Sequence, residues 1–273
     1  MQCLLIIPHH GIAAQLEDAK AAYKSGVEIL KIAKDPESEA AALAKFQTAA
    51  DLGYPDAFGA IGYFHANGVG GVAQDDAVAF EWFRKGADLG SLSSKVNLAK
   101  FHLEGRGTTP DREKGLLLLK EAASKGSQDA EELLAEVYFL GLYHPEYKPD
   151  FAKALPHVQS CAQRGSASAL NMLGLIHKEG HGVPVDADKA EVFFRQAALK
   201  GDFKAQSNLG EILNPLGEKK SRRVEAAAWL IIAAGRGEPF AVHRVNELQT
   251  QMNSGEWIEA NSAAEDLRAK IQP

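Results

Sequence analysis

The segment from Gly174 to Gly201, GLIHKEGHGVPVDADKAEVFFRQAALKG, displays the unit from which most of this chain is built. It begins within a predicted helix that ends near Gly180, continues through a glycine-containing loop to Asp186, and closes with a second predicted helix. A glycine after a helix accepts the left-handed conformation that terminates the helix. The segment therefore predicts a helix, a loop and a second helix.

The end of this second helix recurs along the chain at nearly constant spacing. A pair of small residues stands four and three places before each of six glycines, which we call the closing glycines: Gly53, Gly90, Gly126, Gly165, Gly201 and Gly237. Successive closing glycines are 37, 36, 39, 36 and 36 residues apart. A period of this length is typical of repeat proteins, in which each copy packs on its neighbours.

Residues counted forward from a closing glycine, here called repeat positions, reveal the buried face of the first helix. Position four is small, and positions eight and eleven are apolar, as in Ala169, Leu173 and Ile176. These spacings place the three side chains on one helical face. Position nine is again small, which lets a neighbouring helix approach closely.

The pattern predicts an all-α protein, an α-solenoid in which antiparallel helix pairs stack into a right-handed superhelix. Residues 15–53 are expected to form an N-terminal helix pair, and residues 238–273 are expected to form C-terminal capping helices, with the closing helix between Leu248 and Ile271. Five predicted repeats lie between them, at 54–90, 91–126, 127–165, 166–201 and 202–237.

These repeats resemble the Sel-one-like repeat family, which is related to the tetratricopeptide repeats. The family pattern, roughly A-x3-L-G-x2-Y-x2-G-x-G-V and then D-x3-A-x2-W-x3-A-A-x2-G, is matched well by Ala57 to Gly90 and Ala169 to Gly201. The third repeat departs from it by an insertion at 141–150, and the fifth by Asn214-Pro215-Leu216-Gly217 and a basic run from Lys219 to Arg223. Both departures are expected to be exposed loops. The resemblance implies a noncatalytic scaffold that binds a peptide or protein segment.

The resemblance also implies that the first helices line a concave groove, in which tetratricopeptide relatives hold peptides. Positions three, six, ten and thirteen point away from the apolar face of a helix that turns about 100° per residue. Among them, Tyr63 and Phe139 are expected to anchor a partner side chain, and Asn171 to bond a partner backbone. An acidic centre on the third repeat is expected to favour basic groups. With two residues from position fourteen, the predicted partner-binding residues are Tyr63, Asn67, Lys100, Glu104, Asp129, Glu132, Glu136, Phe139, Asn171, Lys178 and Glu211. The same positions also hold Asp56, Val96, Lys204 and Ser207.

Nine histidines raise the question of a metal site. His65, His102 and His177 share position twelve, which predicts shared packing, and the distance between repeats prevents three of them from holding one zinc ion. His177 and His181 have the spacing of a helical metal pair, but the helix is expected to end near Gly180, and the zinc-hydrolase motif HExxH is absent. We expect no metal and no cofactor.

The alternative function is a hydrolase acting on cell-wall-related compounds, as the resemblance suggests for cysteine-rich relatives that staple each repeat with a cysteine pair. Cys3 and Cys161 form no such pairs, and Cys161 stands where the other copies have Ala or Gly, which predicts a buried packing residue. The glycine-rich run Asn67 to Gly71 aligns with the repeat loop and lacks the lysine of a phosphate-binding loop. We therefore expect no enzymatic activity. A structural spacer that binds nothing is a third possibility.

The charge of the chain bears on the class of partner. A net charge of -6 supplies no overall field that attracts phosphate, so we expect a protein or peptide partner and no nucleic acid. The basic run Lys219 to Arg223 either binds an acidic partner or is a solvated loop, and the solvated loop is favoured because no aromatic residues are interleaved with it.

The chain termini and apolar segments bear on location. No segment approaches the roughly 20 apolar residues of a membrane-spanning helix. Residues 1–14 are either the remnant of a signal peptide, which would make the protein periplasmic or secreted, or a disordered N-terminus of a cytoplasmic protein. The sequence does not indicate an oligomeric state.

Overall fold

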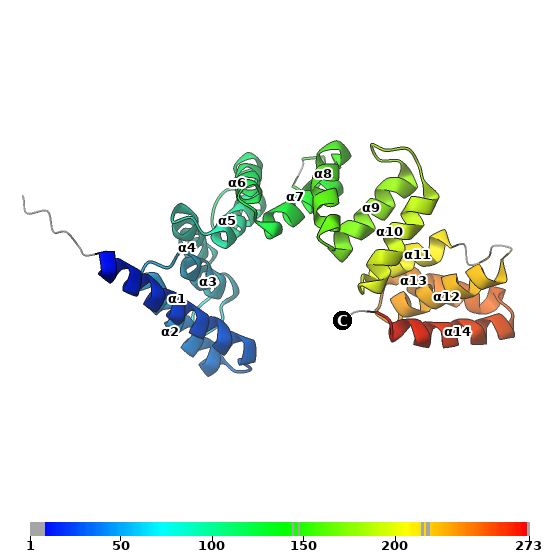
Figure 1. Cartoon of the computed structure of the whole chain (residues 1–273), viewed down its shortest axis with the longest axis horizontal. Coiled ribbons are helices and arrows are strands. Elements are labelled where there is room, and N and C mark those ends of the chain that lie inside the picture. The colour runs from blue at the N-terminus through cyan, green and yellow to red at the C-terminus, as the bar shows by residue number, and fades with distance from the viewer. Residues whose placement is uncertain (1–8, 144, 147, 214–215, 217–218, 272–273) are drawn as a thin grey trace, which may run out of the picture. The chain divides into compact units, whose positions relative to one another are not determined.

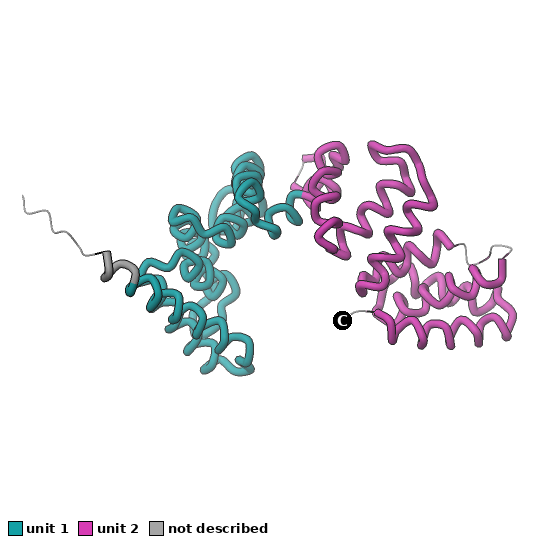
Figure 2. Tube along the Cα trace, in the orientation of Figure 1, with its two compact units in different colours: residues 1–134 teal, residues 135–273 magenta. Residues whose placement is uncertain are grey.

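The computed structural model describes residues 9–143, 145–146, 148–213, 216 and 219–271. Within these residues the chain forms fourteen helices and no strand. Figure 1 labels the helices along the chain. The prediction of an all-α protein built as an α-solenoid is confirmed. The chain divides into two compact units, residues 1–134 and residues 135–273 (Figure 2).

The first unit consists of three helix pairs and the beginning of a further helix. Its helices are α1 (His9–Ile32), α2 (Pro36–Asp51), α3 (Pro55–Asn67), α4 (Asp76–Asp88), α5 (Leu92–Glu104), α6 (Arg112–Ser124) and the first half of α7 (Gln128–Leu140). Helix α1 begins at His9, so it extends into the segment 1–14, of which residues 1–8 lie outside the described part.

The second unit contains the rest of α7 and seven further helices. These are α8 (Phe151–Gln163), α9 (Ala167–Glu179), α10 (Ala187–Leu199), α11 (Phe203–Ile212), α12 (Lys220–Ala234), α13 (Pro239–Gln251) and α14 (Ser254–Arg268). Helix α13 carries Ala241, Val245 and Leu248 at positions four, eight and eleven, so it repeats the first-helix pattern. The closing helix α14 accordingly begins at Ser254 and not at Leu248.

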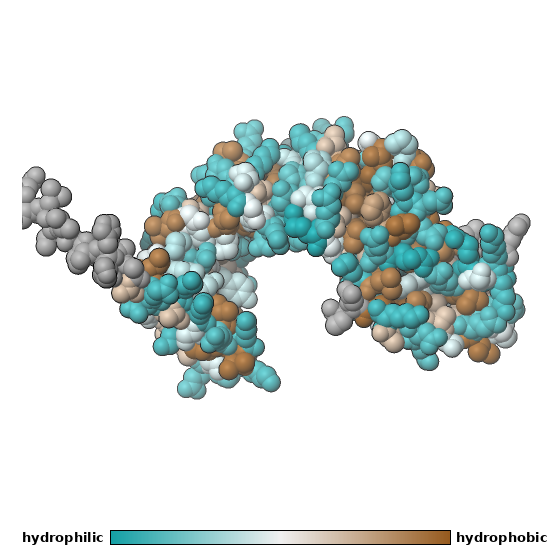
Figure 3. Space-filling view, viewed as in Figure 1, coloured by the Kyte–Doolittle hydropathy of each residue, from teal (hydrophilic) through white to brown (hydrophobic). Residues whose placement is uncertain are grey.

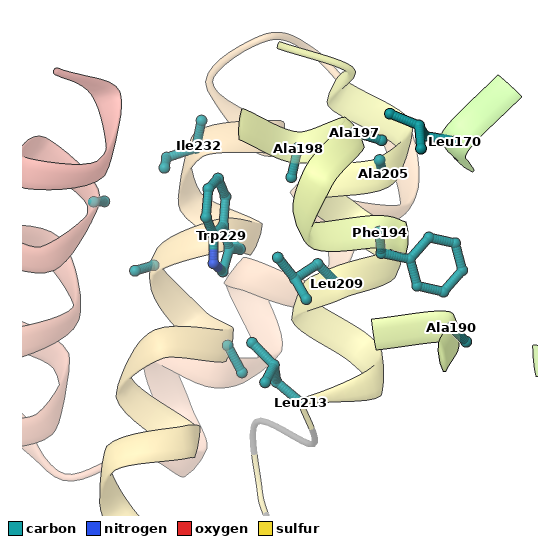
Figure 4. Close-up of a cluster of buried hydrophobic side chains, with 13 residues drawn as sticks. Leu170, Ala190, Phe194, Ala197, Ala198, Ala205, Leu209, Leu213, Trp229 and Ile232 are labelled. Carbon is teal, nitrogen blue, oxygen red and sulfur yellow. The ribbon is translucent and has the colours of Figure 1, made fainter. Parts of the chain in front are cut away.

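The residues of the predicted apolar stripe form the core. Ala169, Leu173 and Ile176 are each at most 5% exposed, and the matching residues of the other first helices are buried as well, except Ile212 and Val245, which are partly buried. In the second unit, side chains of α10, α11 and α12 meet in one cluster around Leu209 and Trp229 (Figure 4). Each helix therefore buries its apolar face against the other helix of its pair and against the next pair.

A close contact holds the two helices of a repeat together. Phe83 of α4 lies directly over Gly62 of α3, where a Cβ atom on the glycine would come within 2.7 Å of the ring. Phe194 of α10 covers Gly174 of α9 in the same way. Both phenylalanines stand seven places before a closing glycine and are at most 2% exposed. The small residue at position nine is thus required by the aromatic ring that packs against it.

Aspartates start the second helices and fix the loops that precede them. Asp75, Asp111 and Asp186 each accept a hydrogen bond from a backbone N–H of the first helical turn, which satisfies a donor that the helix itself leaves unpaired. The backbone N–H of each aspartate donates to the carbonyl oxygen of the position-twelve residue, at 2.7–2.8 Å. The same bond joins Asp150 to Tyr138 at 2.8 Å, so the insertion at 141–150 leaves the frame of the repeat unchanged.

The loop of one repeat also docks on the preceding repeat. Arg106 bonds both carboxylate oxygens of Asp76, the first residue of α4, and donates to the carbonyl oxygen of Ala66 at 3.1 Å. Next to it, Gly107 has a φ of 63° and lies against the backbone of the same turn, where a Cβ atom would be 2.6 Å from the carbonyl carbon of Asp76. This loop therefore ties the second repeat to the first.

We expect Gly107→Ala to destabilise the chain much more than Gly71→Ala. Both glycines have a left-handed φ, which costs an alanine about 1–2 kcal/mol, but a Cβ at Gly71 has no neighbour within 4 Å. At Gly107 the clash with backbone adds an overpacking cost of about 1–3 kcal/mol. Urea unfolding of the two variants checks this prediction. Equal losses of unfolding free energy would show that the loop does not dock as described.

Candidate functional site

Two neighbouring first helices of the first unit present predicted partner-binding residues to solvent. Tyr63 on α3 is 53% exposed, and Lys100 occupies the same repeat position on α5 and is also exposed. Asn67 and Glu104, one turn further along these helices, are exposed as well. We call these four residues the α3–α5 surface.

The groups on the α3–α5 surface differ in how firmly they are held. The Tyr63 ring packs edge-on against Phe64, with ring centroids 6.2 Å apart, and Asn67 donates from Nδ2 to the Tyr63 carbonyl oxygen at 2.8 Å. Glu104 lies 4.0 Å from the guanidinium of Arg106. Lys100 has no ion-pair partner among the described residues. The surface thus combines a positioned aromatic ring with an available positive charge.

The predicted acidic residues lie on α7. Asp129 and Glu132, in the first unit, are exposed and have no ionic partner within the described ranges. Glu136, which belongs to the second unit, is partly buried. Two of the three carboxylates are therefore available to solvent.

The expectation that Phe139 is presented to a partner is wrong. Phe139 is only 8% exposed and packs against Phe151 at the start of α8, with ring centroids 5.4 Å apart. Leu103 at the same position is 5% exposed and lies against Gly115 at the start of α6. The last turn of a first helix faces the first turn of its antiparallel partner, so a large apolar residue at position thirteen is buried between them. Lys178, at this position on α9, is exposed.

Position six is also internal in most repeats. Asn171 is 7% exposed, and its Oδ1 accepts a hydrogen bond from Asn208 at 2.9 Å. The expectation that Asn171 bonds a partner backbone is therefore wrong. Val96 and Ser207 are buried too, and Ser207 donates to Glu238 at 3.0 Å. The physical reason is that position six faces the first helix of the next repeat.

Other predicted residues bond to neighbouring repeats while keeping some exposure. Glu211 accepts a hydrogen bond from Arg244 on α13 at 3.0 Å, and Asp56 accepts one from Ser91 at 2.5 Å. Lys204 is exposed. Among the predicted residues, those of the second unit are thus mostly engaged within the fold, whereas those on α3 and α5 are mostly exposed.

The basic run Lys219 to Arg223 is not a solvated loop. Lys220 begins α12 and pairs with Glu259 at 2.7 Å, Arg222 pairs with Glu191 at 2.8 Å, and Arg223 pairs with the buried carboxylate of Glu256. These cations are used to tie α12 to α10 and α14. Of the preceding segment 214–217, only Leu216 lies within the described residues, and it is exposed.

The insertion at 141–150 is only partly exposed. Pro145, Glu146, Lys148 and Pro149 are exposed, whereas Gly141 is buried and Leu142 is partly buried. Residues 144 and 147 lie outside the described part.

Two of the three histidines at position twelve, His102 and His177, pack against aromatic rings. His102 is 4% exposed, and its ring meets Phe80 edge-on at 5.2 Å; His177 stacks on Phe193 at 5.5 Å. Burial, together with the positive charge of Lys114, lowers the pKa of His102 below its usual value, against a smaller opposite effect of Asp111. Within the described ranges, no group of three His, Cys, Asp or Glu side chains is arranged to hold a metal ion.

His177 and His181 do not share a helical face. Helix α9 ends at Glu179 and Gly180 adopts the left-handed C-cap conformation, with a φ of 75°. The His181 ring instead stacks on Phe151 of the preceding repeat, with centroids 3.7 Å apart, and its Nε2 lies 2.6 Å from Glu179 Oε2. His181 therefore joins the loop to α8. Cys161 is fully buried and accepts a hydrogen bond from Arg164 at 3.2 Å.

Comparison with known protein families gives matches along most of the repeat region. The model described as Sel1 repeat matches residues 59–91, 93–127, 128–160, 167–202 and 203–238, which together make up more than half of the chain. The chain belongs to the Sel1 repeat family. The predicted resemblance to Sel-one-like repeats is confirmed.

Curated relatives share part of their length with this chain. It is 30% identical over 174 residues to an uncharacterized protein of Neisseria meningitidis serogroup B, covering 64% of this chain and 35% of that protein. It is 29% identical to chitin synthase regulatory factor 3 of Schizosaccharomyces pombe, covering 58% and 17%, and 29% identical to DAP3-binding cell death enhancer 1 of Mus musculus, covering 51% and 34%. The matches span about a third or less of these relatives.

Solved structures show the same fold. A Sel1 repeat protein from Oxalobacter formigenes superposes with a TM-score of 0.71 at 20% identity, covering 92% of this chain and 97% of that one. A protective antigen of uropathogenic Escherichia coli strains gives a TM-score of 0.59 at 19% identity, covering 95% and 69%. Sel1 repeat solenoids are generally noncatalytic modules that bind proteins.

Among the described residues, no helix is long and apolar enough to cross a membrane.

We expect the stability of this Sel1 repeat protein to depend on pH through His102. Because its folded-state pKa is lowered, the unfolded chain binds a proton first as the pH falls below the ordinary histidine value of about 6.5. As the pH is lowered from that value to the folded-state pKa of His102, the unfolding free energy therefore decreases. The variant His102→Tyr should remove the pH dependence that His102 causes. A tyrosine fits at this repeat position, because Tyr138 occupies it in the third repeat and is 4% exposed. Urea titrations at several pH values check the difference; parallel pH profiles for wild type and variant would contradict it.

Proposed function

We propose that this chain is a noncatalytic scaffold that binds a peptide or protein segment on the exposed faces of its first helices, with the α3–α5 surface as the main contact. The proposal rests on Tyr63, an aromatic side chain that is half exposed although most large apolar residues of the first helices are buried. Exposed tyrosines supply large contact areas at little entropic cost and are frequent binding hot spots.

The charges around Tyr63 indicate which partner this surface would favour. Lys100 lies on the neighbouring helix at the same repeat position, and neighbouring helix axes are about 10 Å apart. A partner segment that places an apolar side chain against the Tyr63 ring can therefore bring a carboxylate to Lys100. Asp129 and Glu132 on α7 would favour basic groups of the same or another partner.

The comparisons support the class of function without naming a partner. One relative is described as DAP3-binding, which supports a protein-binding role for this chain. The hydrolase alternative has less support, because this chain does not have the cysteine pair in each repeat that the cysteine-rich relatives have. Figure 3 shows that hydrophilic residues cover most of the visible face, with smaller hydrophobic patches between them.

The proposal is tested by photo-crosslinking in the native host. The full chain is expressed with the photoreactive residue benzoylphenylalanine in place of Tyr63, and crosslinked proteins are identified by mass spectrometry. Leu117 on α6, which is 57% exposed on a second helix, takes the same replacement as a matched control. We expect a reproducible partner from position 63 that is absent from position 117 and is reduced about 10-fold by Lys100→Glu, the loss of one charged contact.

Two results would contradict the proposal. Identical crosslinked proteins from positions 63 and 117 would show non-specific contact. A folded Tyr63 variant that gives no crosslinked protein would favour the structural spacer.

A further inference from the structure

A pocket of about 440 Å³ lies in the second unit, whereas the α3–α5 surface belongs to the first. Its walls are the second helices α8 and α10, and its floor is the first helix α9 between them. A volume of this size accommodates a small molecule or an inserted peptide side chain with its adjoining backbone. Both walls and the floor belong to the same compact unit.

The residues of the walls are uncharged at places where other repeats carry charges. Gln159 on α8 stands six residues before a closing glycine, the place that Arg84 and Arg195 occupy elsewhere. Arg195 uses this place to pair with Glu225 of the next second helix. On the floor, Leu170 stands at the position of Lys95, which pairs with Glu121 at 2.8 Å. Glutamine and leucine thus replace two cations that bind across to other helices.

The pocket combines an apolar floor with carboxamides on both walls. Leu170, Leu173 and the Phe193 ring provide the apolar part. Gln159 and Gln163 lie one turn apart on α8, and Gln196 faces them from α10; all three are exposed. A carboxamide offers both a donor and an acceptor, so it can match the N–H and C=O groups of a peptide backbone.

These features assign a class of ligand. The backbone groups of an extended peptide point alternately to its two sides, where the glutamines of α8 and α10 can bond both edges, while an apolar side chain enters the floor. The residues that line the pocket include no aspartate, glutamate, lysine or arginine, so charged side chains gain no ion-pair partner from them. We propose that the α8–α10 pocket is a second binding site, which takes an uncharged extended peptide segment bearing a leucine, methionine or phenylalanine.

The environment of His177 agrees with this assignment. Its ring lines the pocket and stacks on Phe193, and its Nδ1 has no hydrogen-bonding protein partner in the described part of the chain. The pocket therefore has an unpartnered polar atom beside it, in addition to the three carboxamides.

The test uses the full chain and a phage-displayed library of random short peptides. Peptides enriched on the wild-type chain are synthesised with both termini blocked, and their affinities are measured by isothermal titration calorimetry. We expect enriched peptides without charged residues, centred on an apolar side chain, whose affinity does not change with salt. Gln159→Ala combined with Gln163→Ala should weaken binding about 10- to 30-fold, the effect of losing two hydrogen bonds.

A filling variant and its matched control locate the site. Ala162→Met fills the pocket from α8 and should abolish binding, whereas Ala123→Met, at the equivalent partly exposed place on α6, should leave it unchanged. Tyr63→Ala separates this site from the α3–α5 surface and should also leave binding unchanged. Enrichment of charged peptides only, no enrichment, or wild-type affinity in a folded Ala162→Met variant would each overturn the proposal.

Discussion

The fold depends on one contact within each repeat, in which a large side chain of the second helix packs directly on a small residue of the first. Where the second helix supplies a phenylalanine seven places before its closing glycine, as in Phe83 and Phe194, the first helix has a glycine beneath the ring. Elsewhere the pair varies: Leu119 stands opposite Ala99, and Leu230 packs on Gly210. The small residue lets the two helix axes come close together, and this approach determines which positions remain for other contacts. It also limits substitution, because close-packed interiors tolerate little added volume.

Periodicity was enough to predict the helix pairs, the loops and the buried stripe, because each of these recurs in every repeat. The side that a single residue faces was harder to predict. Phe139 points away from the stripe on an isolated helix, yet the first turn of α8 covers it. The basic run at Lys220 resembles a solvated segment, but its charges are matched by Glu191 and Glu259 on neighbouring helices. Such contacts join residues on different helices, from 12 to 39 positions apart in the chain, and a pattern along one helix does not register them.

The residues available for function are those that the repeat does not use. Asn171 and Glu211 are polar and occupy predicted groove positions, but they bond to neighbouring repeats. Tyr63 keeps half of its surface exposed and Lys100 has no ionic partner in the described ranges. The sequence did not reveal the α8–α10 pocket, because glutamines such as Gln159 carry no repeat signal and become meaningful only when two second helices and the floor between them are seen together.

The most direct measurement of the central contact is a double-mutant cycle on Gly174 and Phe194, followed by urea unfolding. Gly174→Ala in the wild-type chain should lower the unfolding free energy by about 2 kcal/mol, because the new methyl group meets the ring. In a Phe194→Leu background, where the pair resembles Ala99 and Leu119, the same change should cost at least about 1 kcal/mol less. Effects that add to within about 0.5 kcal/mol would contradict the claim that these two residues close the repeat together.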